Sequence, residues 1–394
     1  MLLLTATVVG IAIALNYLLN PYGAWRTALI NPIFRKIEHE RVVTPYLLRT
    51  AGPETILLGS SRVLMGMRIE QGERAGFMNA ALTAATIDQL SRIVSVALEN
   101  PHLKRIVWGV DFFSFNTGWD KRDPNFDARM SGNIGVKVED TLLSSAVLGD
   151  GYDYARRAIR GESRLPATMT AAMPWPMTLI CEQLGATKYR GLQVTPTPEI
   201  EDELAQDLPD YAAYRPSREF MLRLRETVAA ARARGIDVVM FVPPMSEYEL
   251  ELIRQSGQWE TFQEFKRQLA LIGPYWDFSG YNTMARTDEL FMHVMHFKIA
   301  VGQLMLRIVL GADTAPCSEA ARIVTDAAVR VNNVNADAEI VRQDRLRADA
   351  TRAPSLYSRL AARAIARRGR DRAAHASEYA GQDETRSAAM AATR

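Results

Sequence analysis

The chain has 394 residues, of which 48% are hydrophobic, so it can build one large domain or two ordinary ones with a sizeable core. Its 47 basic and 45 acidic residues leave a net charge of +2, which gives no electrostatic reason to expect nucleic acid as a partner. The two cysteines, Cys181 and Cys317, show neither metal-site spacing nor a disulfide framework, and they are compatible with either redox compartment.

The first 19 residues carry no charge and are mostly apolar. A helix needs about 20 apolar residues to cross a bilayer, so residues 1–19 predict an uncleaved transmembrane anchor. A cleaved signal peptide is the alternative, because Ala-Ile-Ala at residues 12–14 resembles a small-residue cleavage site. The segment lacks the basic start that a signal peptide has, and this favours the anchor.

Three basic residues, Arg26, Arg35 and Lys36, follow the apolar run. Taken literally, the positive-inside rule would leave the rest of the chain in the cytoplasm. A basic segment ahead of Met1 would reverse this orientation. We therefore expect a single-pass protein of the inner membrane whose body lies in the periplasm.

Residues 20–53 predict a juxtamembrane connector, because prolines interrupt any long helix there. An α/β domain is expected over residues 54–311, where strand and helix patterns alternate and indicate a mostly parallel sheet covered by helices on both faces. The predicted strands are 55–59, 76–81, 105–111, 236–244 and 274–282, and the predicted helices are 85–100, 218–235, 246–273 in two pieces, and 296–311.

Two regions depart from this alternation. Residues 112–215 contain many Pro, Asp and Gly residues, and we expect them to form an insertion over the working edge of the sheet. Residues 312–394 are rich in Ala, Arg and Asp and poor in large apolar side chains. They predict one solvated helix near 335–350, followed by a disordered basic tail.

Polar side chains stand where the predicted strands end. In open α/β sheets, ligands bind at the carboxyl ends of the strands, so these side chains are candidates for a site. They are Ser61, Arg62, Asn79, Asp111, Ser246 and Asp277, joined by His293 and His296 at the start of the closing helix.

A catalytic serine requires a base, which is usually histidine. The chain has five histidines, and we expect only His293 and His296 to fall where they can meet Ser61. A metal pair formed by these two histidines is not expected, because no third ligand has suitable spacing. Neither a metal nor a cofactor is therefore predicted.

The strand that ends in Gly-Ser-Ser at 59–61 is similar to the first block of the SGNH (GDSL-type) hydrolase superfamily. More closely, the chain resembles a group of membrane-anchored bacterial proteins with SGNH-like bodies that are associated with exopolysaccharide production. The resemblance implies a flavodoxin-like, SGNH-type three-layer α/β sandwich, with Ser61 as nucleophile and His296 as base. The segments that carry it are Asn-Pro-Tyr-Gly at 20–23, Gly-Ser-Ser-Arg at 59–62, Gly-x-Asp-Phe-Phe at 109–113 and Asp-Phe-Ser-Gly-Tyr-Asn at 277–282.

Two positions depart from the superfamily pattern. The oxyanion-hole glycine would lie near Thr83-Ala84, but the oxyanion-hole asparagine would fall on Asp111, where a carboxylate opposes catalysis unless it is protonated or turned away. The aspartate that orients the base would fall on His293, which cannot supply negative charge. Asp277, Asp288 or Glu289 are the acids that could replace it.

The leading functional interpretation is an O-acyl esterase or acyltransferase that acts on a polysaccharide or acylated glycan of the cell envelope. The alternative is a catalytically degenerate accessory or scaffold protein of polysaccharide biosynthesis or export. Export or acylation machinery is the expected protein partner. The turn at 59–61 also has a purely structural explanation, since its hydroxyls could cap the next helix, and Arg62 could simply pair with Asp111.

Overall fold

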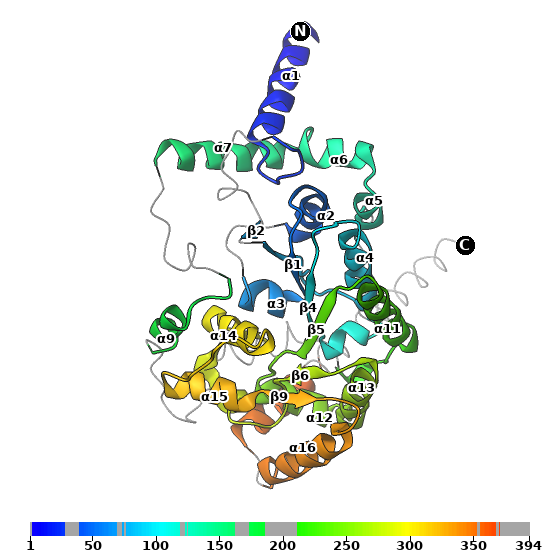
Figure 1. Ribbon diagram of the computed structural model, residues 1–394, viewed down its shortest axis with the longest axis vertical. Helices are drawn as coiled ribbons and strands as arrows, with labels where there is room; N and C mark the ends of the chain where they lie inside the picture. Colours follow the sequence, from blue (N-terminus) through cyan, green and yellow to red (C-terminus); the bar gives the residue numbers. More distant parts are fainter. Residues whose placement is uncertain are drawn as a thin grey trace, which may run out of the picture.

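The computed structural model shows a mixed α/β fold (Figure 1). It describes residues 2–27, 39–68, 73–74, 76–118, 123, 125–161, 173–185, 211–352, 355–367 and 370. Within these residues, seven strands form one sheet in the order β2-β3-β1-β4-β5-β6-β9. The predicted α/β class with a mostly parallel sheet is thereby confirmed.

Five neighbouring strands of this sheet are parallel, and the strand at each edge is antiparallel to its neighbour. The parallel strands are β3 (Phe77–Asn79), β1 (Thr55–Leu58), β4 (Arg105–Gly109), β5 (Asp237–Val242) and β6 (Tyr275–Asp277). The edge strands are β2 (Glu73–Arg74) and β9 (Val329–Val331). All five strands predicted from the sequence are present, with ends within a few residues of the prediction.

Alternate residues of the central strands point into two separate cores, because side chains alternate across a strand. Ile56 and Trp108 belong to one core, whereas Leu57, Val107 and Phe241 belong to the other. Both faces of the sheet are therefore buried, which explains why β1 and β4 read as continuous apolar runs rather than alternating ones.

Helices cover both faces. One core is closed by α2 (Glu40–Thr50), α4 (Ile87–Ala97), α11 (Arg218–Ala233), α12 (Glu247–Gln255), α13 (Trp259–Ile272) and α16 (Ala336–Ala350). The other is closed by α3 (Ser61–Gly66), α9 (Met177–Gly185), α14 (Ile299–Val309) and α15 (Glu319–Ala327). The helices predicted at 85–100, 218–235, 246–273 and 296–311 correspond to α4, α11, the pair α12 and α13, and α14.

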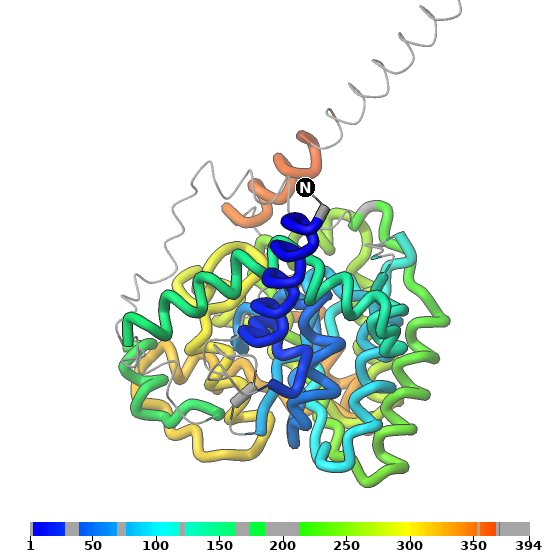
Figure 2. Tube along the Cα trace, turned by 90° about the horizontal axis from the view of Figure 1, so that it is seen from above, coloured from blue at the N-terminus to red at the C-terminus, as the bar shows by residue number. Residues whose placement is uncertain are grey.

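The N-terminal segment forms helix α1 (Leu2–Leu19), which projects from the body (Figure 1). Its lower end packs against α7 (Ser145–Ile159), which passes the base of α1 (Figure 2), and the Asn16 amide donates hydrogen bonds to the carbonyl oxygens of Leu142 and Ser144. Among the described residues, no helix combines the length and the apolar character required to cross a membrane, which is at odds with the transmembrane anchor predicted over residues 1–19.

The predicted connector and insertion are partly built into the body. Helix α2 lies within the predicted connector 20–53, yet its Val43, Leu47 and Leu48 are buried in the core. The predicted insertion 112–215 contributes a short helix at its start, η2, and another at its end, η3. It also supplies helices that include α5 and α6. Four parts of the insertion lie outside the described residues: 119–122, 124, 162–172 and 186–210. The bounds are η2 Phe112–Phe115, α5 Phe126–Met130, α6 Ile134–Thr141 and η3 Tyr211–Ala213.

The α/β unit continues past residue 311, where the sequence analysis ended it. Strand β9 pairs with β6, and the predicted solvated helix near 335–350 is α16, which begins with buried Ala336. A further helix over 356–367 buries Tyr357 and Leu360. These helices bury a few large side chains among small alanines such as Ala361 and Ala364, so the low content of large apolar residues did not reveal their burial. Residues 371–394 of the predicted tail lie outside the described residues.

The two cysteines form a disulfide between Cys181 in α9 and Cys317, which lies just before α15. The bond joins segments 136 residues apart in the sequence, next to the core formed by α9, α14 and α15. Cysteine spacing gave no sign of it, because the two residues meet only through the packing of these helices.

Candidate active site

The turn between β1 and α3 sets the position of Ser61. Gly59 has a φ of 154°, and a Cβ atom there would lie 2.4 Å from Cγ2 of Val63, so only glycine fits this close approach. The Ser60 side chain accepts a hydrogen bond from the Arg62 N–H and caps α3. The capping role proposed for this turn thus belongs to Ser60, and the Ser61 hydroxyl is turned elsewhere.

The Ser61 hydroxyl meets His296. Nε2 of His296 lies 2.9 Å from Oγ of Ser61, although the two residues are 235 positions apart in the sequence. Ser61 is the first residue of α3, and His296 begins β8 (His296–Phe297). Both side chains are half-buried, so the pair is reachable from solvent. The structure therefore brings together the two residues that the sequence proposed as nucleophile and base.

His293 holds the opposite side of the His296 ring. It ends β7 (Phe291–His293), which pairs with β8 in a small antiparallel hairpin, and the two histidines face each other across it. Their Nδ1 atoms lie 3.2 Å apart. When His296 donates its Nδ1–H to His293, its Nε2 is left unprotonated and can accept the proton of Ser61, which is the tautomer that a general base needs.

The environment keeps His296 neutral. Burial, followed by the positive charge of Arg62 and the neighbouring His293, lowers the pKa of His296 to about 3. A neutral ring is the form that accepts a proton. However, a pKa this far below neutral also describes a weak base, because burial, Arg62 and His293, the causes that act on the ring among the described residues, all disfavour the imidazolium.

Two of the three acids proposed as substitutes for the missing orienting aspartate, Asp277 and Asp288, are engaged elsewhere. Asp277 lies 2.9 Å from Nζ of Lys266 and accepts hydrogen bonds from Ser279. Asp288 accepts a hydrogen bond from the Tyr248 hydroxyl at 3.2 Å. Within the described part of the chain, the polar partner of Nδ1 of His296 is His293.

Arg62 lies in a buried charge cluster directly behind Ser61. Its guanidinium is fully buried, donates to Glu249 and lies 3.4 Å from Oδ1 of Asp111. Glu249 also accepts a hydrogen bond from the Tyr211 hydroxyl at 2.6 Å. The predicted pairing of Arg62 with Asp111 is present, and Glu249 is an additional partner that sequence reasoning missed.

Asp111 is buried beside Arg62. It is 1% exposed, and its closest charged neighbour is Arg62. Burial raises the pKa of Asp111 to about 6, while Arg62 opposes this shift. The carboxylate that the superfamily pattern placed in the oxyanion hole is therefore part of the buried charge cluster.

Two other predicted site residues support helices. The Asn79 amide donates to the carbonyl oxygens of Val63 and Met67 at 3.2 Å each, which closes the end of α3. Ser246 is buried and caps the start of α12 through the Glu249 N–H. Both residues stabilise the helices that carry the site. A polar residue at a strand end can either support a helix or bind a ligand, and the sequence pattern is the same in both cases.

The loop predicted to supply the oxyanion-hole glycine has a glycine-like backbone. Ala84 has a φ of 51°, in the left-handed region that favours glycine. The neighbouring Thr83 N–H donates to Oε1 of Glu40 at 3.0 Å, and Arg41 donates to the Thr83 carbonyl. Glu40 and Arg41 at the start of α2 thus hold this loop in place. Nothing in the sequence pattern indicated that these two residues contact the loop.

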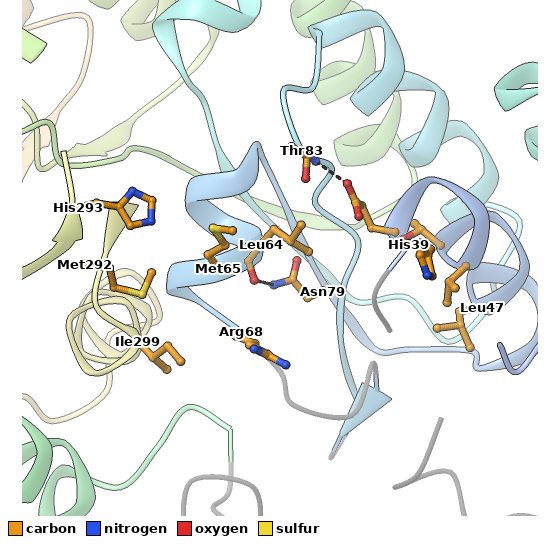
Figure 3. Close-up of a pocket in the computed structure, with 13 residues that line it drawn as sticks. His39, Leu47, Leu64, Met65, Arg68, Asn79, Thr83, Met292, His293 and Ile299 are labelled. Carbon is orange, nitrogen blue, oxygen red and sulfur yellow. Dashed lines mark hydrogen bonds between the residues drawn. The ribbon is translucent and has the colours of Figure 1, made fainter. Parts of the chain in front are cut away.

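A pocket of about 420 Å³ opens beside the histidine pair (Figure 3). Met292, His293 and Ile299 lie on one side of it and His39 and Leu47 on the other, with Leu64 and Met65 of α3 between them. The full lining is His39, Glu40, Val43, Thr44, Leu47, Leu64, Met65, Arg68, Asn79, Thr83, Met292, His293 and Ile299.

No group of three or more His, Cys, Asp or Glu side chains in the described residues could hold a metal ion. No protein-family model matches the sequence, and no curated protein or solved structure shows significant similarity to it. The chemistry of the site must therefore be argued from its geometry.

Proposed function

We propose that the protein is a serine esterase or O-acyltransferase of the SGNH type that acts on acylated glycans of the cell envelope or exopolysaccharide. The observation that carries the proposal is the 2.9 Å contact between Oγ of Ser61 and Nε2 of His296. A serine at the start of a helix, with a neutral imidazole on its hydroxyl, is the arrangement that nucleophilic acyl transfer requires.

The proposed reaction proceeds in two steps. Ser61 Oγ attacks the acyl carbonyl while Nε2 of His296 takes its proton, and backbone N–H groups at the start of α3 stabilise the oxyanion. The ester C–O bond then breaks, and the imidazolium returns the proton to the departing sugar oxygen. In the second step, water or another sugar hydroxyl attacks the acyl-serine, His296 again accepts and returns the proton, and Ser61 is released.

An oxidising, extracytoplasmic location is part of the proposal. The Cys181–Cys317 disulfide supports it, because disulfides persist mainly outside the cytoplasm. Leu3, Leu4 and Val8 of α1 are exposed, which supports attachment of this helix to the inner membrane or to export or acylation machinery.

A second candidate function is a non-catalytic accessory role in polysaccharide assembly. The specific observation in its favour is that His296 has histidine rather than a carboxylate at Nδ1, together with a pKa of about 3. In this second role the site would bind a ligand without turning it over, because a base this weak would not take the proton of Ser61.

The decisive experiment compares Ser61→Ala with Ser95→Ala. Ser95 is an exposed serine of α4 whose hydroxyl bonds only within its own helix, so it is the matched control. We expect Ser61→Ala to lower hydrolysis of p-nitrophenyl esters, and glycan acylation in cells, by several orders of magnitude. We expect Ser95→Ala to change neither. Equal activity of both variants would exclude the enzyme and leave the accessory role.

A further inference from the structure

We infer that the pocket beside Ser61 binds a linear, apolar acyl chain, so that the preferred substrates are esters of medium-chain acids rather than acetyl esters. The inference rests on the proposed function, since it names the acyl group that Ser61 transfers.

The pocket adjoins the proposed reaction centre through His293, although neither Ser61 nor His296 lines it. His293 lines it, and the same ring lies 3.2 Å from His296, whose other nitrogen contacts Ser61. Leu64 and Met65 also line it, and they follow Ser61 by three and four positions on α3. Residues three and four apart lie on the same face of a helix, so Ser61 shares with Leu64 and Met65 the face of α3 that borders the pocket.

The surface that a ligand would meet is mainly apolar. Val43 and Leu47 of α2, Leu64 and Met65 of α3, Met292 of β7 and Ile299 of α14 provide it. Two of these, Met65 and Met292, are each 42% exposed. Methionine side chains are flexible and adapt to the shape of an apolar ligand, which suits a chain that must enter and leave.

Several polar groups of the lining are already hydrogen-bonded within the protein. The Asn79 amide donates to carbonyl oxygens of α3, and the Thr83 N–H donates to Glu40. Groups that already hydrogen-bond within the protein are poor partners for the hydroxyls of a sugar. A sugar buried in this pocket would therefore keep hydroxyl groups without hydrogen-bond partners. The pocket is therefore suited to the acyl side of the ester, and the glycan lies outside it.

The volume of the pocket limits the length of the acyl chain that it can hold. A methylene group is comparable in size to a water molecule, whose share of liquid volume is about 30 Å³. A pocket of about 420 Å³ therefore has room for about 14 groups of this size, which is enough for a medium-chain acyl group of about eight to twelve carbons. An acetyl group would leave most of it filled by solvent, whereas each methylene that is buried contributes roughly a fourfold gain in affinity.

The test uses the full chain and a series of p-nitrophenyl esters: acetate, butyrate, octanoate and laurate. We expect kcat/KM for octanoate to exceed that for acetate by about tenfold or more, and Leu64→Trp to reduce this ratio several-fold by filling the pocket. Leu271→Trp is the matched control, because Leu271 is a 59% exposed leucine of α13 outside the pocket, and the ratio should stay at the wild-type value.

A binding measurement separates this inference from the proposed function. Titration calorimetry with octanoate on the Ser61→Ala protein should show binding that weakens several-fold with Met65→Asp, a change at an exposed position that the fold tolerates. Ser61-dependent cleavage with acetate preferred and no octanoate binding would overturn the acyl-chain inference and leave the esterase. Octanoate binding without cleavage of any ester would overturn the esterase and leave the pocket as an apolar binding site.

Discussion

The Nδ1 atoms of His293 and His296 lie 3.2 Å apart, so one Nδ1–H can bridge the two imidazole rings at the place where a serine hydrolase usually has a carboxylate. This contact can set the tautomer of His296, but an imidazole adds no negative charge that would favour the imidazolium. The pair therefore provides orientation without electrostatic stabilisation.

This relationship predicts that His293→Asp increases activity. An aspartate at 293 would accept the Nδ1–H of His296, and an adjacent carboxylate raises a histidine pKa by about 1–3 units. We expect kcat/KM for ester hydrolysis at neutral pH to rise by about tenfold or more, because the base becomes stronger. The pH dependence of kcat/KM should show an acid limb at higher pH than in the wild type.

The control for this prediction is His293→Asn, which can accept the same hydrogen bond without a charge. If His293→Asp and His293→Asn have the same rate and the same pH profile, charge at position 293 has no part in the reaction. A loss of activity in both would indicate that the histidine pair itself is required.

The sequence was sufficient to predict the sheet and the central pair of the site. Continuous apolar runs revealed β1, β4 and β5, because strands buried on both faces need them. Position at the end of a strand and before the closing helix singled out Ser61, His293 and His296, and the resemblance to the SGNH superfamily implied Ser61 as nucleophile and His296 as base. Local patterns are sufficient for strands, whose burial shows in consecutive residues.

Other features depend on contacts between distant segments and left no local trace. Glu249 lies in the first turn of α12 with acidic residues around it, which is typical of a solvated face, yet it is fully buried against Arg62. Strand β9 has only three residues and joins the sheet at its edge. The pairing of Cys181 with Cys317 likewise depends on how α9 and α15 pack.

The buried charge cluster predicts that Arg62→Met is strongly destabilising. The change would leave Glu249 and Asp111 buried without their cation, and removal of one partner from a buried ion pair costs about 3–5 kcal/mol. The free energy of unfolding, measured by urea denaturation, should fall by that amount. Since α3 carries Ser61, activity should be lost along with stability.

Arg105→Met is the matched control for this change. Arg105 lies 2.7 Å from Asp237, but both side chains are well exposed, so the pair should contribute no more than about 1 kcal/mol. Equal losses for the two variants would mean that Arg62 does not neutralise the buried acids.

The disulfide predicts a large stability difference between the oxidised and reduced protein. A bond that closes a loop of 136 residues removes much of the entropy of the unfolded chain, and we expect the double variant Cys181→Ser with Cys317→Ser to lose about 3–5 kcal/mol. Thermal denaturation with and without a reductant would measure it. Two titratable thiols in protein isolated from an oxidising compartment would contradict the bond, as would equal melting temperatures.

Asp111 predicts that part of the stability depends on pH in an unusual direction. Its folded-state pKa is about 6, raised above the ordinary value of 3.8 by burial. Between these two values the folded protein binds more protons at this group than the unfolded chain does, so its contribution is complete below about pH 4 and is lost as the pH rises through 6. The variant Asp111→Asn carries no charge to bury. Its unfolding free energy relative to the wild type should therefore increase by about 2–3 kcal/mol between pH 4 and pH 7, as urea denaturation at a series of pH values would show.

Asp237→Asn removes an exposed acid and should give a flat difference over the same range. A flat difference for Asp111→Asn as well would mean that Arg62 keeps Asp111 ionised throughout, and that the cluster behind Ser61 carries a permanent negative charge.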